Sequence, residues 1–95
     1  SKAALESLVR ALALELGRQG ISVNAVMPGI IATQAIQSLP GSGQMLDATN
    51  EMMLVKDKTL TTADVANVVL FLSSSLSDLV QGQVIAVDGG ILVRV

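Results

Sequence analysis

The sequence contains no cysteine and no histidine. Without cysteine the chain forms neither disulfides nor thiolate metal sites. Without histidine it lacks the commonest metal ligand and general base. Metal-dependent chemistry is therefore not expected.

Aromatic residues and charge are also scarce. Phe71 is the single aromatic residue, so aliphatic side chains and methionine must fill the core. The formal net charge is −2 and there is no basic block, which gives no indication of a nucleic-acid surface or of a contact with anionic membranes. The sequence also has no apolar run long enough to span a bilayer and no signal-like start. We expect a cytoplasmic protein that binds neither nucleic acid nor membrane.

Hydrophobic periodicity predicts two helices and two strands. Apolar residues recur at helical spacing over residues 3–16 and again over residues 62–74. Short apolar runs that are rich in β-branched residues predict strands at residues 23–26 and 84–87. Two strands are too few for a stable parallel sheet, so we expect the chain to be part of a longer polypeptide.

Single residues refine these elements. Thr61 and Asp64 have the spacing of a capping box, which assigns Asp64 to the start of a helix and not to chemistry. Glu6 and Arg10 stand four residues apart and can pair on the solvent side of their helix. Asn24 lies among apolar residues, so we expect its amide to bind the backbone of a neighbouring loop.

The middle of the chain is the least regular part. Residues 34–39 can form a helical turn, the Pro-Gly-Ser-Gly run at 40–43 breaks it, and residues 44–54 can resume as a helix. Met45, Met52 and Met53 lie in this stretch. Methionines fill ordinary cores and also adapt to irregular apolar ligands, and spacing alone favours the core.

Pro28 and Gly29 interrupt the first predicted strand. Proline removes an amide donor, and glycine lets a ligand approach the backbone closely. Ligands of open α/β sheets bind beyond the carboxyl ends of the strands. We therefore expect Pro28 to end the ladder and the backbone after it to form a ligand lip, although a strand-terminating turn explains the same residues.

Three motifs resemble the short-chain dehydrogenase/reductase family. Residues 23–33 read VNAVMPGIIAT and are similar to the family pattern V-N-x-V-x-P-G-x-[IV]-x-T. Residues 1–5, SKAAL, resemble the second half of the Tyr-x-x-x-Lys active-site helix, and residues 82–90, GQVIAVDGG, resemble the closing strand. The run at 35–40 is similar to enoyl-acyl-carrier-protein reductases of this family.

The resemblance implies an α/β fold, the carboxy-terminal portion of a Rossmann-like doubly wound parallel-sheet domain. Residues 1–95 would be the last part of one domain whose amino-terminal, cofactor-binding half is absent. The resemblance also implies an NAD- or NADP-dependent oxidoreductase that transfers hydride between nicotinamide and a carbonyl or enoyl group. The substrate would be a small molecule or an acyl thioester on an acyl carrier, as in fatty acid biosynthesis.

The same resemblance assigns roles to five residues. Lys2 would hold the nicotinamide ribose and lower the pKa of a tyrosine one helical turn earlier, which this chain does not contain. Pro28, Gly29, Ile31 and Thr33 would bind the cofactor, with the backbone pairing with the nicotinamide carboxamide. On sequence alone, without the resemblance, a lysine beside a terminus is nearly always solvated.

Two further expectations follow from the family. Its oligomers use both helices and the closing strand, so we expect a homo-oligomer, specifically a tetramer, with the apolar residues 91–95 docked on a neighbouring subunit or domain. A non-catalytic member that binds nucleotide or only assembles with partners is the alternative, because fold does not determine function.

Overall fold

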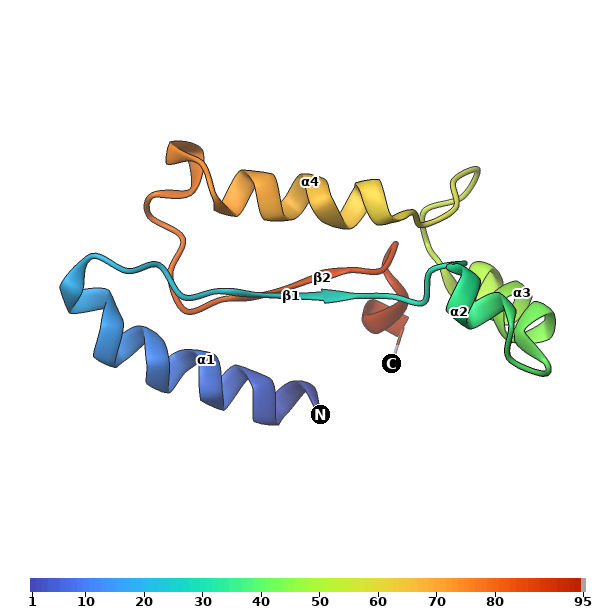
Figure 1. The fold of residues 1–95 in the computed structure, drawn as a ribbon, viewed down its shortest axis with the longest axis horizontal. Coiled ribbons are helices and arrows are strands. Elements are labelled where there is room, and N and C mark those ends of the chain that lie inside the picture. Colours follow the sequence, from blue (N-terminus) through green and yellow to red (C-terminus); the bar gives the residue numbers. More distant parts are fainter. Residues whose placement is uncertain (95) are drawn as a thin grey trace.

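Two short parallel strands form the centre of the fold. In the computed structural model, which describes residues 1–94, β1 (Ala25–Pro28) pairs with β2 (Val84–Val87) residue for residue. Helix α1 (Lys2–Leu16) covers one face of this pair and α4 (Thr62–Leu72) covers the other (Figure 1). The predicted α/β architecture is confirmed, and the second strand has the predicted bounds.

Two amide side chains hold the strands together before the ladder begins. The Gln81 side chain accepts a hydrogen bond from the N–H of Val23 at 2.7 Å and donates one to the carbonyl of Ile21 at 2.9 Å. The Asn24 side chain donates to the carbonyl of Val80 at 3.0 Å and accepts from the N–H of Gln83 at 2.9 Å. The expected link from Asn24 to a neighbouring loop is confirmed.

Strand β1 begins and ends two residues later than the predicted range of 23–26, and its ladder ends at Pro28, as predicted, with Pro28 itself paired with Val87. Ala25 and Gly29 each donate a backbone N–H to the β2 segment, at 2.8 and 3.0 Å. Alternate residues of a parallel strand bond to the same neighbour, so Pro28 lies at a position that faces the opposite edge. The missing proline N–H therefore costs this ladder no hydrogen bond.

Helix α1 begins at Lys2, one residue earlier than predicted, because the Ser1 hydroxyl caps it by accepting a backbone N–H at 3.2 Å. The chain leaves the helix end through Gly20, whose φ of 80° is left-handed. Glu6 pairs with Lys2, at 3.7 Å, instead of with the expected Arg10. Glu6 lies four residues from both Lys2 and Arg10, and in the structure it pairs with the lysine on its N-terminal side.

Helix α4 begins at Thr62, as predicted, with a complete capping box. The Thr61 hydroxyl accepts from the N–H of Asp64 at 3.3 Å, and the Asp64 carboxylate accepts from the Thr61 N–H at 2.8 Å. The helix ends at Leu72, two residues earlier than predicted. Ser73 terminates it because its hydroxyl bonds back to the carbonyl four residues earlier, at 2.8 Å.

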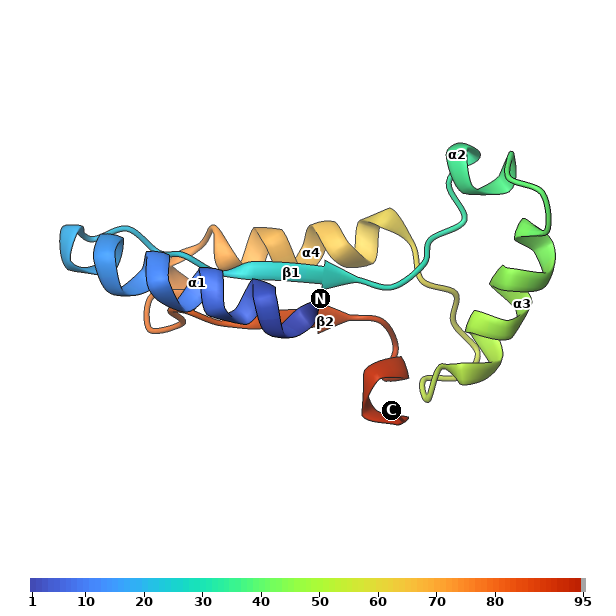
Figure 2. The ribbon, with the colours of Figure 1, turned by 90° about the horizontal axis from the view of Figure 1, so that it is seen from below.

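Two helices form an arm beyond the end of the sheet (Figure 2). The predicted turn is α2 (Gln34–Gln37), and α3 (Ser42–Met52) follows it. Helix α3 starts two residues earlier than the predicted range of 44–54 and also ends two residues earlier. Gly41, with a φ of 77°, completes the turn in one residue, so Ser42 and the glycine after it join the helix.

The apolar tail expected at residues 91–95 is a 3₁₀-helix, Ile91–Arg94, and Val95 lies outside the described residues. The side chain of Leu92 is 37% exposed and that of Val93 is 77% exposed. None of the helices within residues 1–94 has both the length and the apolar character that crossing a bilayer requires.

The fold leaves much apolar surface uncovered. Its accessible surface is 6629 Å², whereas a compact monomer of 9.8 kDa has about 5,200 Å². The radius of gyration is 15.4 Å, against about 12.4 Å expected for this length. Among the described residues, only Val9, Met53 and Leu60 are buried apolar side chains. The sheet and its helices therefore enclose little core within residues 1–94.

The capping box predicts an acid-sensitive helix start. The backbone hydrogen bond from Thr61, and then its hydroxyl, hold the pKa of Asp64 below its ordinary value, with a smaller contribution from Lys58. A lowered pKa in the folded state stabilises the fold above the unfolded pKa, and this contribution is lost as pH falls through the folded value. In the intact polypeptide, Asp64→Asn should therefore flatten the decline of Tm between about pH 5 and pH 2. An unchanged slope in a thermal melt series would contradict this role.

The exposed apolar surface predicts how these 95 residues behave when they are expressed alone. Both sheet edges lack a neighbouring strand within residues 1–94, and the helices have little core to cover. We expect an aggregated or molten product by light scattering and near-ultraviolet circular dichroism. A monodisperse monomer with a cooperative melt would contradict the argument.

Candidate functional site

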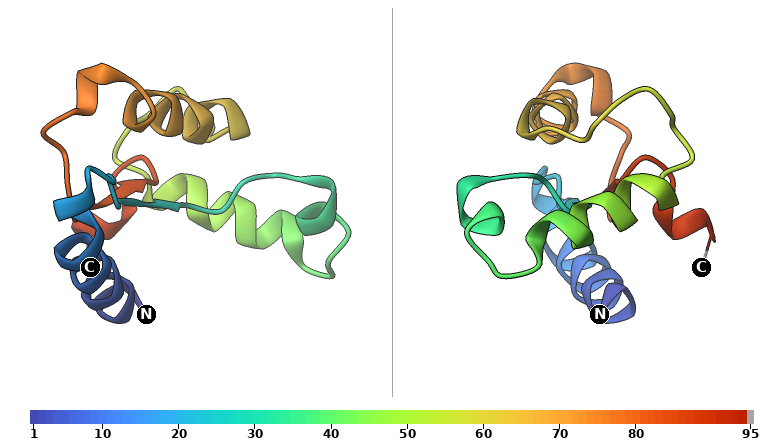
Figure 3. Two further views of the ribbon diagram at one scale, coloured as in Figure 1. Left: turned by 60° about the vertical axis from the view of Figure 1, so that its left-hand side comes forward. Right: turned by 90° about the vertical axis from the view of Figure 1, so that its right-hand side faces the viewer.

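An apolar hollow of about 300 Å³ lies at the carboxyl ends of both strands. Met27, Pro28, Gly29 and Ile30 of the β1 segment form one wall. Helix α3 contributes Thr49 and Met52, and the chain after β2 contributes Asp88, Ile91 and Leu92. Figure 3 shows α3 crossing the end of the sheet towards the carboxy-terminal segment. Most of the lining is hydrocarbon and sulfur, so the hollow suits an apolar group.

The β1 side of the hollow is the predicted lip. Gly29 is tied to the sheet through its N–H, but the next two backbone amides, of Ile30 and Ile31, have no hydrogen-bond acceptor within residues 1–94. The Ile31 carbonyl accepts from the N–H of Thr33 at 2.8 Å. The Thr33 hydroxyl accepts from the first turn of α2 at 3.3 Å, and its own hydrogen can still donate. The lip thus presents donors to a ligand.

Gly29 is required by its close neighbour Asp88. A β-carbon at position 29 would lie 3.1 Å from a methyl of Leu60 and 3.2 to 3.3 Å from the Cβ and Cα of Asp88. The backbone of the lip therefore packs directly against the end of β2, and a side chain at position 29 would force its neighbours to shift.

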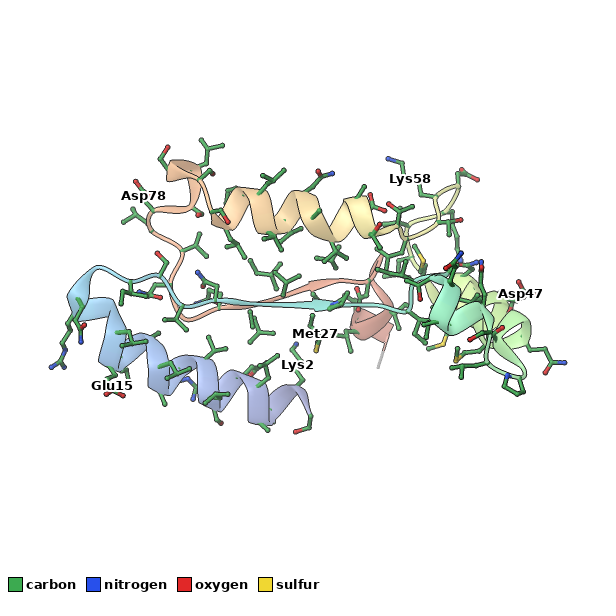
Figure 4. All side chains as sticks on the ribbon, in the orientation of Figure 1. Lys2, Glu15, Met27, Asp47, Lys58 and Asp78 are labelled. Atoms are coloured by element: carbon green, nitrogen blue, oxygen red, sulfur yellow. The ribbon has the colours of Figure 1, made fainter. Side chains whose placement is uncertain are left out.

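Lys2 lies at the same end of the sheet as the lip. Figure 4 shows Lys2 and Met27 between the sheet and α1. Lys2 lines a second, more open hollow, and Asp88 and Leu92 line both hollows. The structure therefore places Pro28 and Gly29 in one hollow and Lys2 in the other, and Ile31 and Thr33, further along the lip, line neither.

Asp88 is a site residue that the sequence indicated only as a member of the closing-strand motif at residues 82–90. Its side chain is 8% exposed, and its two oxygens accept separate backbone hydrogen bonds, from Gly90 at 2.9 Å and Leu92 at 3.0 Å. The available signal was its position: a carboxylate that directly follows a predicted strand and precedes Gly-Gly.

The two adjacent methionines behave differently. Met53 is buried, at 4% exposure, and packs where a side chain at Gly89 would be. The Gly89 carbonyl accepts the N–H groups of Leu54 and Val55 at 2.8 and 3.0 Å. Met52 is 43% exposed and lines the hollow. The prediction that these methionines fill the core is confirmed for Met53, whereas Met52 faces the apolar hollow.

The chain is similar to proteins of known families. A family model described as enoyl-(acyl carrier protein) reductase matches residues 1–92. The enoyl-[acyl-carrier-protein] reductase [NADH] of Synechocystis is 42% identical over 95% of this chain and 34% of its own length. Cyclohexanol dehydrogenase of Rhodococcus is 40% identical over 96% of this chain and 33% of its own length. The chain spans about a third of the length of the curated relatives it matches.

Solved structures match equally well. A putative 2-deoxy-D-gluconate 3-dehydrogenase from Agrobacterium tumefaciens, with bound NADP, has a TM-score of 0.83 and 34% identity. This match covers 98% of this chain and 37% of that one. The 3-oxoacyl-[acyl-carrier protein] reductase of Brucella melitensis has a TM-score of 0.80 and 34% identity, covering 95% of this chain and 32% of that one.

The close contact between Gly29 and Asp88 predicts the effect of adding a methyl group at position 29. Gly29→Ala should lower the free energy of unfolding of the intact polypeptide by about 1–3 kcal/mol, because the new methyl presses on the backbone of Asp88. Urea denaturation measures the change. The matched control is Gly43→Ala in α3, where a β-carbon meets nothing within 4 Å and should stabilise by about 0.5–1 kcal/mol. Equal effects of the two substitutions would contradict the close approach at position 29.

Proposed function

The chain belongs to the short-chain dehydrogenase/reductase family, and from this we propose that its polypeptide is an NAD(P)-dependent oxidoreductase acting on a carbonyl or enoyl group. The apolar hollow, bordered by a lip of backbone donors at the carboxyl ends of parallel strands, is the observation that carries the proposal. The lip would hold the cofactor and the hollow the substrate.

The lip fits the nicotinamide carboxamide. That group offers an oxygen that accepts and an amine that donates. The N–H groups of Ile30 and Ile31 can donate to the oxygen, and the Thr33 hydroxyl can donate to a second cofactor atom. Pro28 and Gly29 bring this backbone to the edge of the hollow. Bound nicotinamide would supply the hydride chemistry, and either NAD or NADP presents the same group.

The hollow favours an acyl substrate. Hydroxyl groups of a sugar would have few partners among its isoleucine, leucine and methionine side chains, and unpaired buried hydroxyls are costly. Relatives whose names specify enoyl- and 3-oxoacyl-[acyl-carrier-protein] reductases support the same choice. We propose an acyl thioester, which the apolar walls bind through its hydrocarbon.

Lys2 would supply a cation beside the reacting end. A phenol has an ordinary pKa near 10, so it exchanges protons slowly at neutral pH unless a cation stabilises the phenolate. Residues 1–95 contain no tyrosine, so another part of the polypeptide would have to contribute it. Lys2 would also donate to the hydroxyls of the nicotinamide ribose.

We further propose a homo-oligomer, specifically a tetramer. Helix α1 exposes Leu8 and Leu14 at 56% and 65%, and α4 exposes Leu70 at 67%. Such apolar surfaces on both outer helices are suited to protein contacts.

Replacing Lys2 tests the proposed function. In the intact polypeptide, Lys2→Met removes the cation but keeps most of the stem, and turnover should fall by at least about a hundredfold. Steady-state oxidation of NADH or NADPH with crotonyl and acetoacetyl thioesters measures this. The control, Arg10→Met, removes an exposed cation from the same helix and should leave turnover within about twofold.

Two outcomes would change the proposal. Unchanged turnover in Lys2→Met would make Lys2 a solvated helix residue. Binding of NADH without turnover of any thioester by the unaltered protein would support the non-catalytic alternative instead.

A further inference from the structure

We propose that Asp88 is a positioning residue that determines substrate specificity, by fixing Ile91 and Leu92 as one wall of the apolar hollow. The proposal rests on the proposed function, because it assumes that the hollow receives an acyl chain. Asp88 itself need not touch the reacting atoms. It acts through the segment that it holds.

The segment after β2 is fixed at two points: the Gly89 carbonyl accepts two N–H groups from the chain that follows α3, and Asp88 accepts two more from the segment itself. Gly89 and Gly90 follow Asp88 with φ values of 67° and 95°, a pair of conformations that glycine adopts at low cost. The backbone bond from Val93 to Gly90, at 3.2 Å, closes only a single turn. The bonds at Gly89 lie before this turn, whereas the two hydrogen bonds of Asp88 reach into it and orient it against the sheet.

The carboxylate suits this task better than an amide. Its two oxygens accept separately from the N–H groups of Gly90 and Leu92, at 2.9 and 3.0 Å. Asparagine has one accepting oxygen, and its NH₂ group would face the other N–H, so one bond is lost. Alanine loses both. Alanine at position 88 should therefore disturb the turn more than asparagine does.

The wall that Asp88 fixes adjoins α3. Ile91 and Leu92 line the hollow together with Thr49 and Met52, while Gly29 and the lip lie on the β1 side. A substrate with its reacting carbon at the lip extends its hydrocarbon between these two walls. A short acyl chain has little contact with Leu92, and a longer chain has more. Loosening the wall should therefore weaken long substrates more than short ones.

The experiment compares acyl-chain lengths in the intact polypeptide. The probes are thioesters of N-acetylcysteamine, assayed with NADH and with NADPH. Crotonyl and octenoyl thioesters are the short and long enoyl substrates, and acetoacetyl and oxooctanoyl thioesters are the short and long oxoacyl substrates. For Asp88→Asn the ratio of kcat/KM for the long chain to that for the short chain should fall by at least about fivefold, mainly through KM, and Asp88→Ala should lower it further. Amide hydrogen exchange at Gly90 and Leu92 should accelerate in the same order.

Two further variants separate positioning from general damage. Asp64→Asn makes the same chemical change at an exposed helix cap and should leave the chain-length ratio unchanged. Leu92→Ala removes the wall side chain and should lower the ratio, and adding Asp88→Ala to it should have little extra effect. Additive effects would show that Asp88 does not act through Leu92.

Each remaining outcome is decisive. Equal losses of kcat/KM at both chain lengths, or unchanged amide exchange in the Asp88 variants, would overturn the proposal while leaving the oxidoreductase function intact. Failure of the unaltered protein to turn over any probe would refute the proposed function, and the specificity role with it, before any variant is compared.

Discussion

The parallel pairing of β1 with β2 is the constraint on which the rest of the structure depends. It joins segments that lie almost 60 residues apart, and the side chains of Gln81 and Asn24 fix its register at the amino end. The register at the amino end determines which residues are neighbours at the carboxyl end of the strands. Gly29 and Asp88 become neighbours only in this alignment, and a slip of one residue would reverse the faces of every side chain that follows.

The regular elements were predictable because their signals are local. Helical periodicity, the Thr61–Asp64 capping box and the β-branched run at Val84–Val87 each act within a few residues. The position of Pro28 inside β1 was not predictable, because it depends on which edge of the strand faces β2. That edge is held by long-range contacts such as the hydrogen bond between Val23 and Gln81, which are 58 residues apart.

The candidate site was predictable only in part for the same reason. The Pro-Gly lip is a feature of one short segment and could be located from it. Asp88, Ile91 and Leu92 join the hollow through long-range packing, which no local pattern encodes. Met52 and Met53 are neighbours of identical chemistry, yet one lines the hollow and the other is buried, because the bonds to Gly89 set the direction in which the chain leaves α3.

Two glycines explain how three separate segments meet so closely at the end of the sheet. Gly29 lets the lip touch the backbone of Asp88, and Gly89 leaves the space that Met53 fills. Both contacts draw a segment of irregular structure onto the rigid strand pair, and a precise site needs such support. The carboxylate of Asp88 then orients the last turn from the same point. The shape of the hollow is therefore set by backbone contacts around β2, and its apolar character by the side chains that these contacts direct inward.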